Sequence, residues 1–476
     1  MHRGVRVRDV LGPASPLRAM LPGYEERPAQ LAMAEAVEAA LVAERPLFVE
    51  AGTGTGKTLA YLLPALLSGK KVIVSTATKA LQEQIFAKDL PLVAQLLSAY
   101  GVTFKASLMK GLTNYLCRRR FQELRASGDL SASARRHLPM LERWVQETDD
   151  GDRAELAELP EDAEVWREVQ SSSETRIGAG CSYHDECFVT AMRREAEDAQ
   201  LVVVNHHLFL ADLALRTGKS GDYASAIPAY DAVIFDEAHQ LEDIATEFFG
   251  VKVSTARLDT LVRDAHKSLV SAGLVDPVLG TGAGRSLAEQ VGDAAKAFFR
   301  LFAERVAQSD APEGRRILTP EDWTEEIVAA KGKLSAGLEA LQLFAEEQKE
   351  HEVMGLIARR AREVSLDLEE VQGSCRPEAA EAERGEARIA WVDARERSVA
   401  IGSSPIDLGR TLRSKLFDRV APVVLTSATL ATCIGSAPPS FSFARARLGA
   451  PGDTRELIVP SPFDYPARAA LYVPRD

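Results

Sequence analysis

Short apolar runs recur along the first half of the chain, and each is followed by a segment whose apolar positions have helical spacing. The runs are PLFVE (46–50), KVIVST (71–76), FKASLM (104–109), LVVVN (201–205) and DAVIF (231–235), and a further run, APVVLTSATL (421–430), comes much later. Nearly continuous Val, Ile and Leu predict strands that are buried on both faces. Strands that alternate with helices predict a parallel sheet. The expected fold class is therefore α/β, with a parallel sheet covered by helices.

Two long intervals interrupt this alternation. The first, between Leu116 and Leu201, is polar and helix-prone and contains three of the five cysteines. The second, from Leu241 to about Arg388, has helical periodicity with alternating charge, which is typical of the solvated face of a helical domain. We expect one sheet domain with two mainly helical insertions. The sheet domain would comprise residues 1–109, 201–240 and 388–476, and the insertions residues 110–200 and 241–387.

The composition excludes several classes of protein. With 476 residues, 46% of them hydrophobic, the chain can bury a large core. No apolar run approaches the roughly 18 residues of a membrane span, and five cysteines are too few for a secreted disulfide scaffold. These features predict a cytoplasmic protein with no membrane partner. The net charge of −12 neither supports nor excludes DNA, because phosphate backbones bind to local basic surface.

The segment AGTGTGKT (51–58) lies between a predicted strand and a predicted helix. Its glycines let backbone N–H groups turn toward one point, and the helix N-terminus adds partial positive charge. Lys57 is expected to reach the β- and γ-phosphates of a nucleotide, and the Thr58 hydroxyl to bind Mg²⁺. We therefore interpret the segment as a phosphate-binding loop that consists of Ala51, Gly52, Thr53, Gly54, Thr55, Gly56, Lys57 and Thr58.

The segment DEAH (236–239) follows the buried run DAVIF. The carboxyl end of a buried parallel strand faces the crevice in which the phosphates would lie. We expect Asp236 to hold Mg²⁺ through its water shell, and Glu237 to orient and deprotonate the attacking water. With Lys57, these are the candidate catalytic residues for nucleotide hydrolysis, and His239 is grouped with the nucleotide-binding residues.

A glutamine near the start of a predicted helix is a candidate for recognition of the base. Gln30 ends the segment RPAQ (27–30). A glutamine amide can pair with N6 and N7 of adenine, which would favour ATP over GTP. Arg27 is grouped with it. A glutamine at this place is equally often a helix cap.

Together these segments resemble the superfamily 2 DNA helicases of the XPD/DinG type. They appear in the order of that family, as RPAQ (27–30), AGTGTGKT (51–58), STATKALQEQ (75–84), NYLC (114–117), CSYHDEC (181–187), VVVNHH (202–207), DEAH (236–239) and LTSATL (425–430). The resemblance implies a RecA-like first helicase domain with iron–sulfur and arch insertions. It also implies ATP-driven movement on single-stranded or forked DNA, 5′ to 3′, in DNA repair or replication.

The resemblance assigns roles to further residues. Thr76, Thr78 and Gln82 correspond to a segment that touches the bound strand, as do Asn205 and His206. Ser427, Ala428 and Thr429 correspond to the segment that couples hydrolysis to movement of DNA. From chemistry alone, hydroxyls and amides suit phosphate contacts and helix caps equally well.

The cysteines depart from the family pattern. The family holds an iron–sulfur cluster with four cysteines, of which Cys117, Cys181 and Cys187 are present, whereas Arg176 stands at the fourth place. An arginine cannot replace a thiolate ligand. Three interpretations remain: a cluster with an unusual fourth ligand, a zinc site completed by His184, or no metal.

The end of the sequence also departs from the pattern. After ARAALYVPRD the family would continue into a second ATPase-like domain, whose arginines reach the γ-phosphate. We expect this chain to be the N-terminal motor portion of a longer polypeptide. The alternative is an ATP- and single-stranded-DNA-binding module without motor activity.

Overall fold

The computed structural model describes residues 4–13, 15–20, 25–127, 130–217, 225–274, 283–308, 314–348, 350–375, 387–395, 398–433, 438–463, 470 and 472. Its contacts divide the chain into two compact units. The sheet unit comprises Met1–Gly111, Phe188–Phe248 and Leu408–Asp476, and the insert unit comprises Leu112–Cys187 and Phe249–Asp407.

A seven-stranded sheet forms the centre of the sheet unit. Its order is β11-β1-β10-β5-β2-β4-β3, and every pairing is parallel. The strands are β1 (Leu47–Ala51), β2 (Val72–Thr76), β3 (Ala106–Leu108), β4 (Leu201–Asn205), β5 (Ala232–Asp236), β10 (Val423–Ser427) and β11 (Arg455–Val459). The predicted α/β fold class is confirmed, and each predicted apolar run contains a strand.

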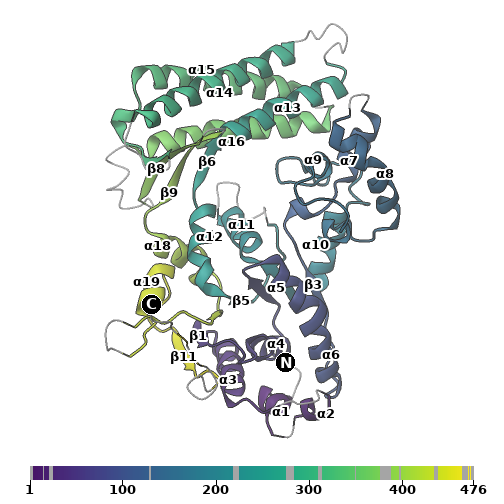
Figure 1. Ribbon diagram of the computed structural model, residues 1–476, viewed down its shortest axis with the longest axis vertical. Coiled ribbons are helices and arrows are strands. Elements are labelled where there is room, and N and C mark those ends of the chain that lie inside the picture. Colours follow the sequence, from purple (N-terminus) through teal and green to yellow (C-terminus); the bar gives the residue numbers. More distant parts are fainter. Residues whose placement is uncertain are drawn as a thin grey trace. The chain divides into compact units, whose positions relative to one another are not determined.

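Helices cover the sheet because successive strand residues point to opposite faces. Val49 and Val74 belong to the core beneath α3, α4 and α6, whereas the Phe235 ring on the other face packs 4.9 Å from that of Phe209 in α11. Figure 1 labels these helices around the strands. The helices of the unit are α1 (Val7–Leu11), α2 (Leu17–Met20), α3 (Pro28–Ala43), α4 (Lys57–Leu67), α5 (Lys79–Gln84), α6 (Leu90–Ser98), α10 (Phe188–Asp198), α11 (His206–Thr217), α12 (Leu241–Phe248), α18 (Leu408–Leu412) and α19 (Ser442–Leu448).

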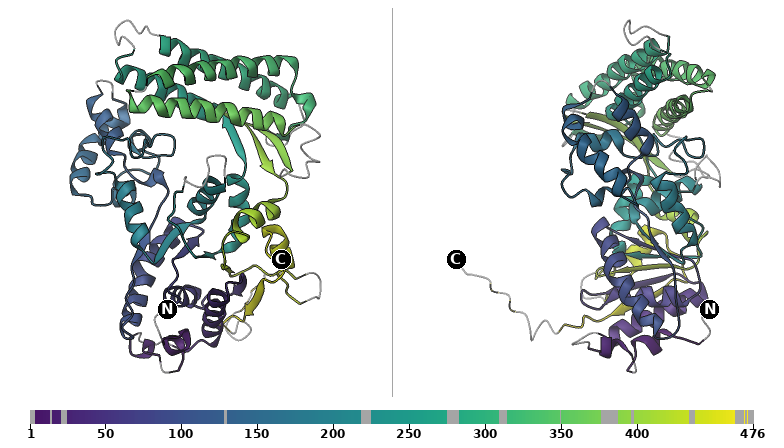
Figure 2. Two further views of the ribbon diagram at one scale, coloured as in Figure 1. Left: turned by 180° about the vertical axis from the view of Figure 1, so that it is seen from behind. Right: turned by 90° about the vertical axis from the view of Figure 1, so that its right-hand side faces the viewer.

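The insert unit is mainly helical. Figures 1 and 2 show its four long helices α13, α14, α15 and α16 lying together beside a small sheet. Phe298, Phe302 and Trp323 pack ring against ring in their core. The helices are α7 (Arg118–Ala126), α8 (Ala132–Glu147), α9 (Glu164–Val169), α13 (Thr255–Ser271), α14 (Ala283–Ala307), α15 (Glu325–Glu347) and α16 (Glu352–Gly373).

The small sheet is antiparallel, with the order β6-β9-β8-β7. Its strands are β6 (Val251–Ser254), β7 (Arg315–Ile317), β8 (Arg388–Arg395) and β9 (Ser398–Pro405). Val392 and Ile401 are buried in the core of the long helices, so β8 and β9 belong to the insert unit. The division by contacts therefore falls at Asp407, whereas the sequence suggested a boundary at 387. Helix α10 likewise groups with the sheet unit, although the sequence suggested that the first insertion extends to residue 200.

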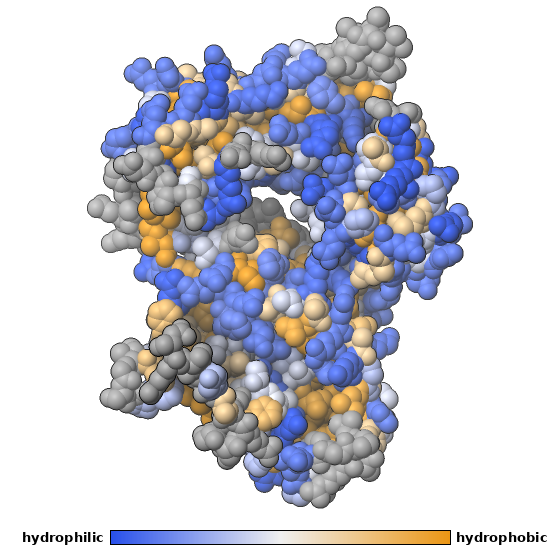
Figure 3. Space-filling model, viewed as in Figure 1, coloured by the Kyte–Doolittle hydropathy of each residue, from blue (hydrophilic) through white to orange (hydrophobic). Residues whose placement is uncertain are grey.

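The surface in Figure 3 is mostly hydrophilic over the long helices, in keeping with their alternating charges. Across the described ranges, the structure contains no helix with the length and apolar content required to cross a bilayer.

Candidate functional site

The phosphate-binding loop connects β1 to α4 at the carboxyl end of the sheet. Gly54 and Gly56 have φ angles of 80° and 82°, a conformation that side chains rarely adopt. A Cβ atom at Gly56 would also collide with the side chain of Gln30, and one at Gly54 with the ring of Phe463. Both positions therefore require glycine. The Thr55 hydroxyl is buried and donates to the Gly52 carbonyl at 2.5 Å, which closes the loop, while Thr53 is exposed at its tip.

Lys57 extends back across this loop. Its Nζ atom donates to the Ala51 carbonyl at 3.2 Å and lies 3.9 Å from Glu237 Oε1. Glu237 follows β5 and has a φ of 56°, so its backbone is held in the left-handed region that is unusual for residues other than glycine. The loop lysine and the acidic pair are therefore neighbours at one end of the sheet.

Asp236 is buried at the end of β5. Its Oδ2 atom accepts a hydrogen bond from the Tyr61 hydroxyl at 3.1 Å. Burial, together with the neighbouring charge of Glu237, raises the pKa of Asp236 to about 6, although Tyr61 and Lys57 oppose the shift. The same burial, with the charge of Asp236, raises the pKa of Tyr61. The Tyr61 hydroxyl thus joins α4, the helix that follows the loop, to the aspartate at the end of β5.

Arg27 and Gln30 support the loop from α3. An Arg27 guanidinium N–H donates to the Gly54 carbonyl at 2.8 Å, and the Gln30 amide donates to the Gly56 carbonyl at 3.0 Å. Gln30 is buried at 3% exposure. In this structure its amide N–H group is used to hold the loop.

The segment Ser427-Ala428-Thr429 begins at the end of β10, which lies between β1 and β5. The Ser427 hydroxyl lies 2.9 Å from His239 Nδ1 and 3.4 Å from Glu237 Oε2, and His239 is 3.5 Å from Glu237. The predicted coupling segment therefore contacts the acidic pair directly through Ser427.

The first set of predicted DNA-facing residues lies after β2. The Thr76 hydroxyl donates to the Thr78 carbonyl at 3.1 Å, and the Thr78 hydroxyl caps α5 by accepting from the Leu81 amide at 3.3 Å. Gln82 is fully buried, and its amide donates to the Met109 carbonyl at 3.0 Å. The Gln82 side chain therefore lies inside the unit in this structure, and its contact with a DNA strand stays a prediction.

The second set lies after β4. Asn205 caps α11, since its Oδ1 atom accepts from the Leu208 amide at 2.8 Å. His206 is 0% exposed, and its Nδ1 atom lies 2.7 Å from the Ser75 hydroxyl. Burial lowers the pKa of His206 to about 4, so the ring is neutral at pH 7. In this structure the His206 ring is buried against Ser75 of β2, and its contact with a DNA strand stays a prediction.

The three cysteines lie at the edge of the insert unit. Cys117 is the N-cap of α7, and its amide donates to the Val169 carbonyl at 2.8 Å. Cys181 and Cys187 lie in a turn in which the His184 amide donates to the Cys181 carbonyl at 2.9 Å. Burial raises the pKa of the Cys117 thiol, although Arg119 and Arg120 oppose the shift. Among the described residues, no three His, Cys, Asp or Glu side chains are grouped so that they could hold a metal.

Three arginines of the first turn of α7 connect this helix to the segments around the cysteine turn and α9. Arg118 donates to the Glu186 carbonyl at 2.8 Å, Arg119 to that of Thr175 at 3.0 Å, and Arg120 to that of Glu168 at 2.8 Å. These three bonds tie α7 to the two segments that contain the cysteine turn and α9. The donor set, with Arg176 in the fourth place, does not fit a four-thiolate cluster.

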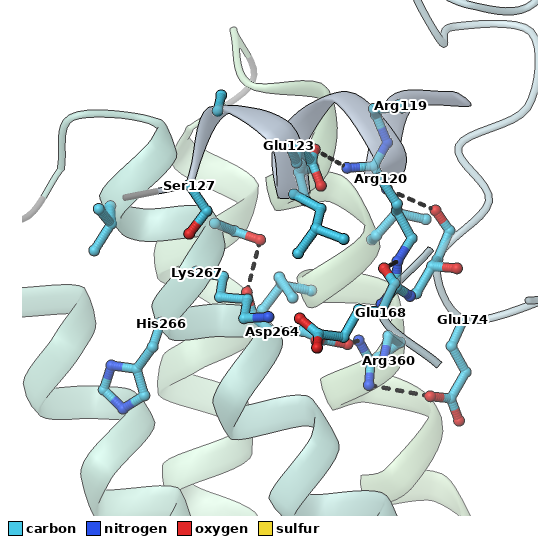
Figure 4. Close-up of a pocket in the computed structure, with 18 residues that line it drawn as sticks. Arg119, Arg120, Glu123, Ser127, Glu168, Glu174, Asp264, His266, Lys267 and Arg360 are labelled. Atoms are coloured by element: carbon cyan, nitrogen blue, oxygen red, sulfur yellow. Dashed lines mark hydrogen bonds and ion pairs between the residues drawn. The ribbon is translucent and has the colours of Figure 1, made fainter. Parts of the chain in front are cut away.

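A separate cavity of about 760 Å³ lies within the insert unit (Figure 4). Five of its charged groups are paired: Arg360 lies 2.7 Å from Asp264 and 3.1 Å from Glu174, and Arg119 binds Glu123. Apart from Arg119, Arg120 and their carbonyl partners Thr175 and Glu168, the residues named above as candidates or their supports do not line it.

Two residues of the nucleotide site were missed in the sequence. Tyr61 stands four residues after Lys57, so helical spacing places both on one face of α4. Glu50 is an acidic residue within the apolar strand β1, and its Oε2 atom accepts from the amides of Leu430 and Ala431 at 2.7 Å each. A carboxylate in an otherwise buried strand is the signal that could have identified it.

Comparisons with known proteins agree with this geometry. The DEAD/DEAH box helicase family matches residues 28–115. The ATP-dependent DNA helicase YoaA of Escherichia coli is 33% identical over 475 residues, covering 98% of this chain and 69% of that protein. YoaA of Haemophilus influenzae is 32% identical, covering 95% of this chain and 66% of that protein. The protein named 3'-5' exonuclease DinG of Bacillus subtilis is 29% identical, covering 97% of this chain and 51% of that protein.

This chain therefore spans between half and about two thirds of the length of these relatives. The match to YoaA of Escherichia coli extends over nearly all of the chain and over more than two thirds of that helicase. The residues of the phosphate-binding loop and of the acidic segment lie together at one end of a parallel sheet, as an ATPase requires. The chain belongs to the family of ATP-dependent DNA helicases that includes YoaA.

Proposed function

We propose that this chain hydrolyses ATP at Lys57, Asp236 and Glu237 and couples the reaction to movement along single-stranded DNA. The direction would be 5′ to 3′, and the setting DNA repair or replication in the cytoplasm. The observation that carries the proposal is the convergence of the loop and the acidic pair: Lys57 Nζ lies 3.9 Å from Glu237 Oε1, and the Tyr61 hydroxyl joins α4, which begins at Lys57, to Asp236.

The chemistry follows from these positions. The backbone N–H groups of the loop and Lys57 would bind the β- and γ-phosphates, so that Lys57 exchanges the Ala51 carbonyl for phosphate oxygens. Glu237 would accept a proton from a water molecule as the water oxygen attacks the γ-phosphorus. The bond between that phosphorus and the bridging oxygen breaks, which gives ADP and phosphate.

The donor chemistry of Thr58 and Asp236 fits a magnesium ion. A hydroxyl and a carboxylate are hard oxygen ligands, and the carboxylate accepts a hydrogen bond from the Tyr61 hydroxyl. When bound, the ion would neutralise charge on the phosphate oxygens. Asp236 would hold it, and Tyr61 would keep the Asp236 carboxylate oriented.

Recognition of the base is proposed for Arg27 and Gln30. Both reach the loop from α3 and bond to its carbonyls, so they lie at the side of the phosphate site. A nucleotide base beside the loop would meet the remaining donors and acceptors of these side chains.

Coupling to DNA is proposed for Thr76, Thr78, Asn205 and the Ser427 segment. Thr78 and Asn205 fix the first turns of α5 and α11, which both begin at carboxyl ends of strands. Ser427 contacts Glu237 and His239, so a shift of its loop would alter the acidic pair. We interpret 110–200 and 241–387 as insertions of the iron–sulfur and arch type, the former without a complete set of cluster ligands.

We further propose that the chain is the N-terminal motor portion of a longer protein. An arginine supplied from a second domain is worth about 10³ or more in rate in related phosphoryl-transfer enzymes. If this proposal holds, the 476-residue chain alone should bind single-stranded DNA weakly, with strong salt dependence.

The test compares ATP hydrolysis and unwinding by the complete protein with those of the 476-residue chain. The complete protein should hydrolyse ATP faster with single-stranded DNA and should unwind a duplex with a 5′ tail but not one with a 3′ tail. Unwinding of the 5′-tailed duplex by the chain alone would show that no second domain is required. Binding of ATP and DNA by the complete protein without hydrolysis would favour a binding module.

A further inference from the structure

The carboxylate of Glu50 joins two segments of the nucleotide site that are far apart in sequence. Glu50 lies in β1, one residue before the phosphate-binding loop, and in the parallel pairing of β1 with β10 it is opposite Ser427. Its Oε2 atom accepts hydrogen bonds from the amides of both Leu430 and Ala431 at 2.7 Å. These are short, charge-assisted bonds to consecutive backbone groups. They hold the chain at the point where it leaves the Ser427-Ala428-Thr429 segment.

The two hydrogen bonds from the Leu430 and Ala431 amides to Glu50, called the clamp below, fix the shape of the loop after β10. The Thr429 amide donates to the Ser427 hydroxyl at 3.3 Å, so the loop folds back on itself before it reaches Glu50. The same Ser427 hydroxyl lies 3.4 Å from Glu237 and 2.9 Å from His239. Glu50 therefore anchors one end of a loop whose other end contacts the proposed catalytic base.

The contacts continue to the phosphate side. Ala51 follows Glu50, and its carbonyl accepts from Lys57 Nζ at 3.2 Å. Lys57 in turn lies 3.9 Å from Glu237. These contacts form a closed series. Glu50 is followed in the chain by Ala51, whose carbonyl accepts from Lys57, and Lys57 lies near Glu237. Glu237 contacts Ser427, and the loop after Ser427 leads back to Glu50. Entry of a nucleotide would alter the Lys57 contacts of this series, and Glu50 is its link to the other end of the loop.

We propose that Glu50 is a positioning residue that sets the loop after β10, so that Ser427 holds Glu237 in place for hydrolysis stimulated by DNA. The inference rests on the proposed function of the Lys57, Asp236 and Glu237 site. A strand at this position needs only an apolar side chain for its packing. The acidic side chain instead satisfies two backbone donors at a site where the chain has no strand partner to do so.

The test uses Glu50→Ala, Glu50→Gln and Asp231→Ala in the complete protein. Asp231 is a matched control, because its carboxylate also accepts from a backbone amide, that of Lys71 at 2.8 Å, at the amino end of β5. Hydrogen exchange of the Leu430 and Ala431 amides reports the clamp without any need for activity. Binding of ADP and ATP hydrolysis with and without single-stranded DNA report its effect.

Glu50→Ala should raise exchange at the two amides by about tenfold or more and should lower kcat with DNA by about tenfold, while ADP binds within about twofold of the parent. Glu50→Gln should keep the amide exchange and the kcat near their parental values. Both amides donate to one carboxylate oxygen, and the glutamine carbonyl oxygen can replace it. Asp231→Ala should change neither.

If exchange rises in Glu50→Ala while kcat and its stimulation by DNA stay at the parental values, the clamp exists but the proposal is overturned. An unchanged exchange rate would overturn it as well. A parent protein that hydrolyses no ATP would instead contradict the proposed function, and the exchange data would still report on the clamp. If Glu50→Ala does not fold, Glu50→Asp, whose carboxylate is one methylene shorter, should show the same two losses, and parental behaviour of that variant would count against the proposal.

Discussion

The hydroxyl of Tyr61 donates a hydrogen bond to Asp236 Oδ2 at 3.1 Å, from the helix after the phosphate-binding loop to the end of β5. This bond joins the helix that follows the phosphate-binding loop to the acidic segment through a fully buried side chain.

Replacement of Tyr61 by Phe should lower ATP hydrolysis by about tenfold, because a buried carboxylate oxygen loses its donor and Asp236 loses its fixed orientation. Steady-state phosphate release at saturating ATP and DNA measures the change. Tyr100→Phe is the matched control, since its hydroxyl donates at 2.7 Å to the Asp9 carbonyl at a site that is largely exposed. Equal rates of ATP hydrolysis for Tyr61→Phe and the parent would show that the Tyr61 hydroxyl does not contribute to the reaction.

Replacement of Lys57 by Ala should abolish ATP hydrolysis, because the β- and γ-phosphates lose their point charge. Phosphate release in the presence of single-stranded DNA measures the loss. Lys70→Ala, which removes only an ion pair with the exposed Glu44, should keep the parental rate. Activity of Lys57→Ala within a few-fold of the parent would contradict the assignment of the loop.

Replacement of Glu237 by Gln should leave ATP and Mg²⁺ bound but lower hydrolysis by about 10² or more, because the proposed base is lost while Asp236 and the loop remain. Nucleotide affinity and phosphate release are measured side by side. Asp236→Asn should show the opposite pattern, with weaker binding of Mg²⁺ and ATP. Loss of nucleotide binding in Glu237→Gln would mean that this residue has a structural role.

Protein purified without oxygen should contain less iron than the four atoms of a complete cluster, because Arg176 occupies the fourth ligand place. Arg176→Cys should raise the iron content and slow its loss in air. Arg135→Cys is the control, because it adds an exposed thiol to α8 of the same insertion. It should change neither the iron content nor the rate at which iron is lost in air. One equivalent of zinc without visible absorbance would favour the alternative site with His184, and neither metal would mean that packing and the α7 arginines alone hold the insertion.

Replacement of Asp322 by Ala should destabilise the insert unit by about 3 kcal/mol, because Asp322 is buried and pairs with Arg305 and Arg316. Although burial opposes it, the Thr319 amide and these arginines lower the pKa of Asp322 below its ordinary value of 3.8. The parent should therefore keep this stabilisation above about pH 4 and lose it as the pH falls through the lower, folded-state pKa.

Chemical denaturation between pH 2 and 7 measures this difference. The stability of Asp322→Ala should depend less on pH below about 4 than that of the parent. Glu363→Ala, which removes an exposed pair with Arg359, should change stability by less than about 0.5 kcal/mol. An Asp322→Ala protein as stable as the parent at pH 7 would show that the buried pair contributes nothing net.

The sheet could be predicted because most of its strands are buried on both faces and leave continuous apolar runs. Strand β11 was not predicted, because it lies at the edge and its Arg455 and Glu456 are exposed. The β8–β9 hairpin was missed for a related reason: Val392 and Ile401 face the helical core while other positions remain partly exposed, so the apolar pattern is diluted.

The residues of the phosphate-binding loop and the acidic pair could be proposed because each type has one physical task at its spacing. Thr78 and Asn205 were ambiguous, because a helix cap and a phosphate contact require the same side chains. The burial of Gln82 and His206 depends on neighbours distant in sequence, such as Met109 and Ser75. No local pattern contains that information.

Strand β10 lies between β1 and β5, so the strand of the phosphate-binding loop and the strand of the acidic pair are joined through a segment near the end of the 476 residues. During synthesis on the ribosome, both insertions emerge before β10 does. The nascent chain therefore cannot join β1 to β5 within one sheet until residues 423–427 have left the exit tunnel. A message cut short before Val423 yields a chain that exposes the paired edges of β1 and β5, which makes it a substrate for chaperones and proteases rather than a partial enzyme.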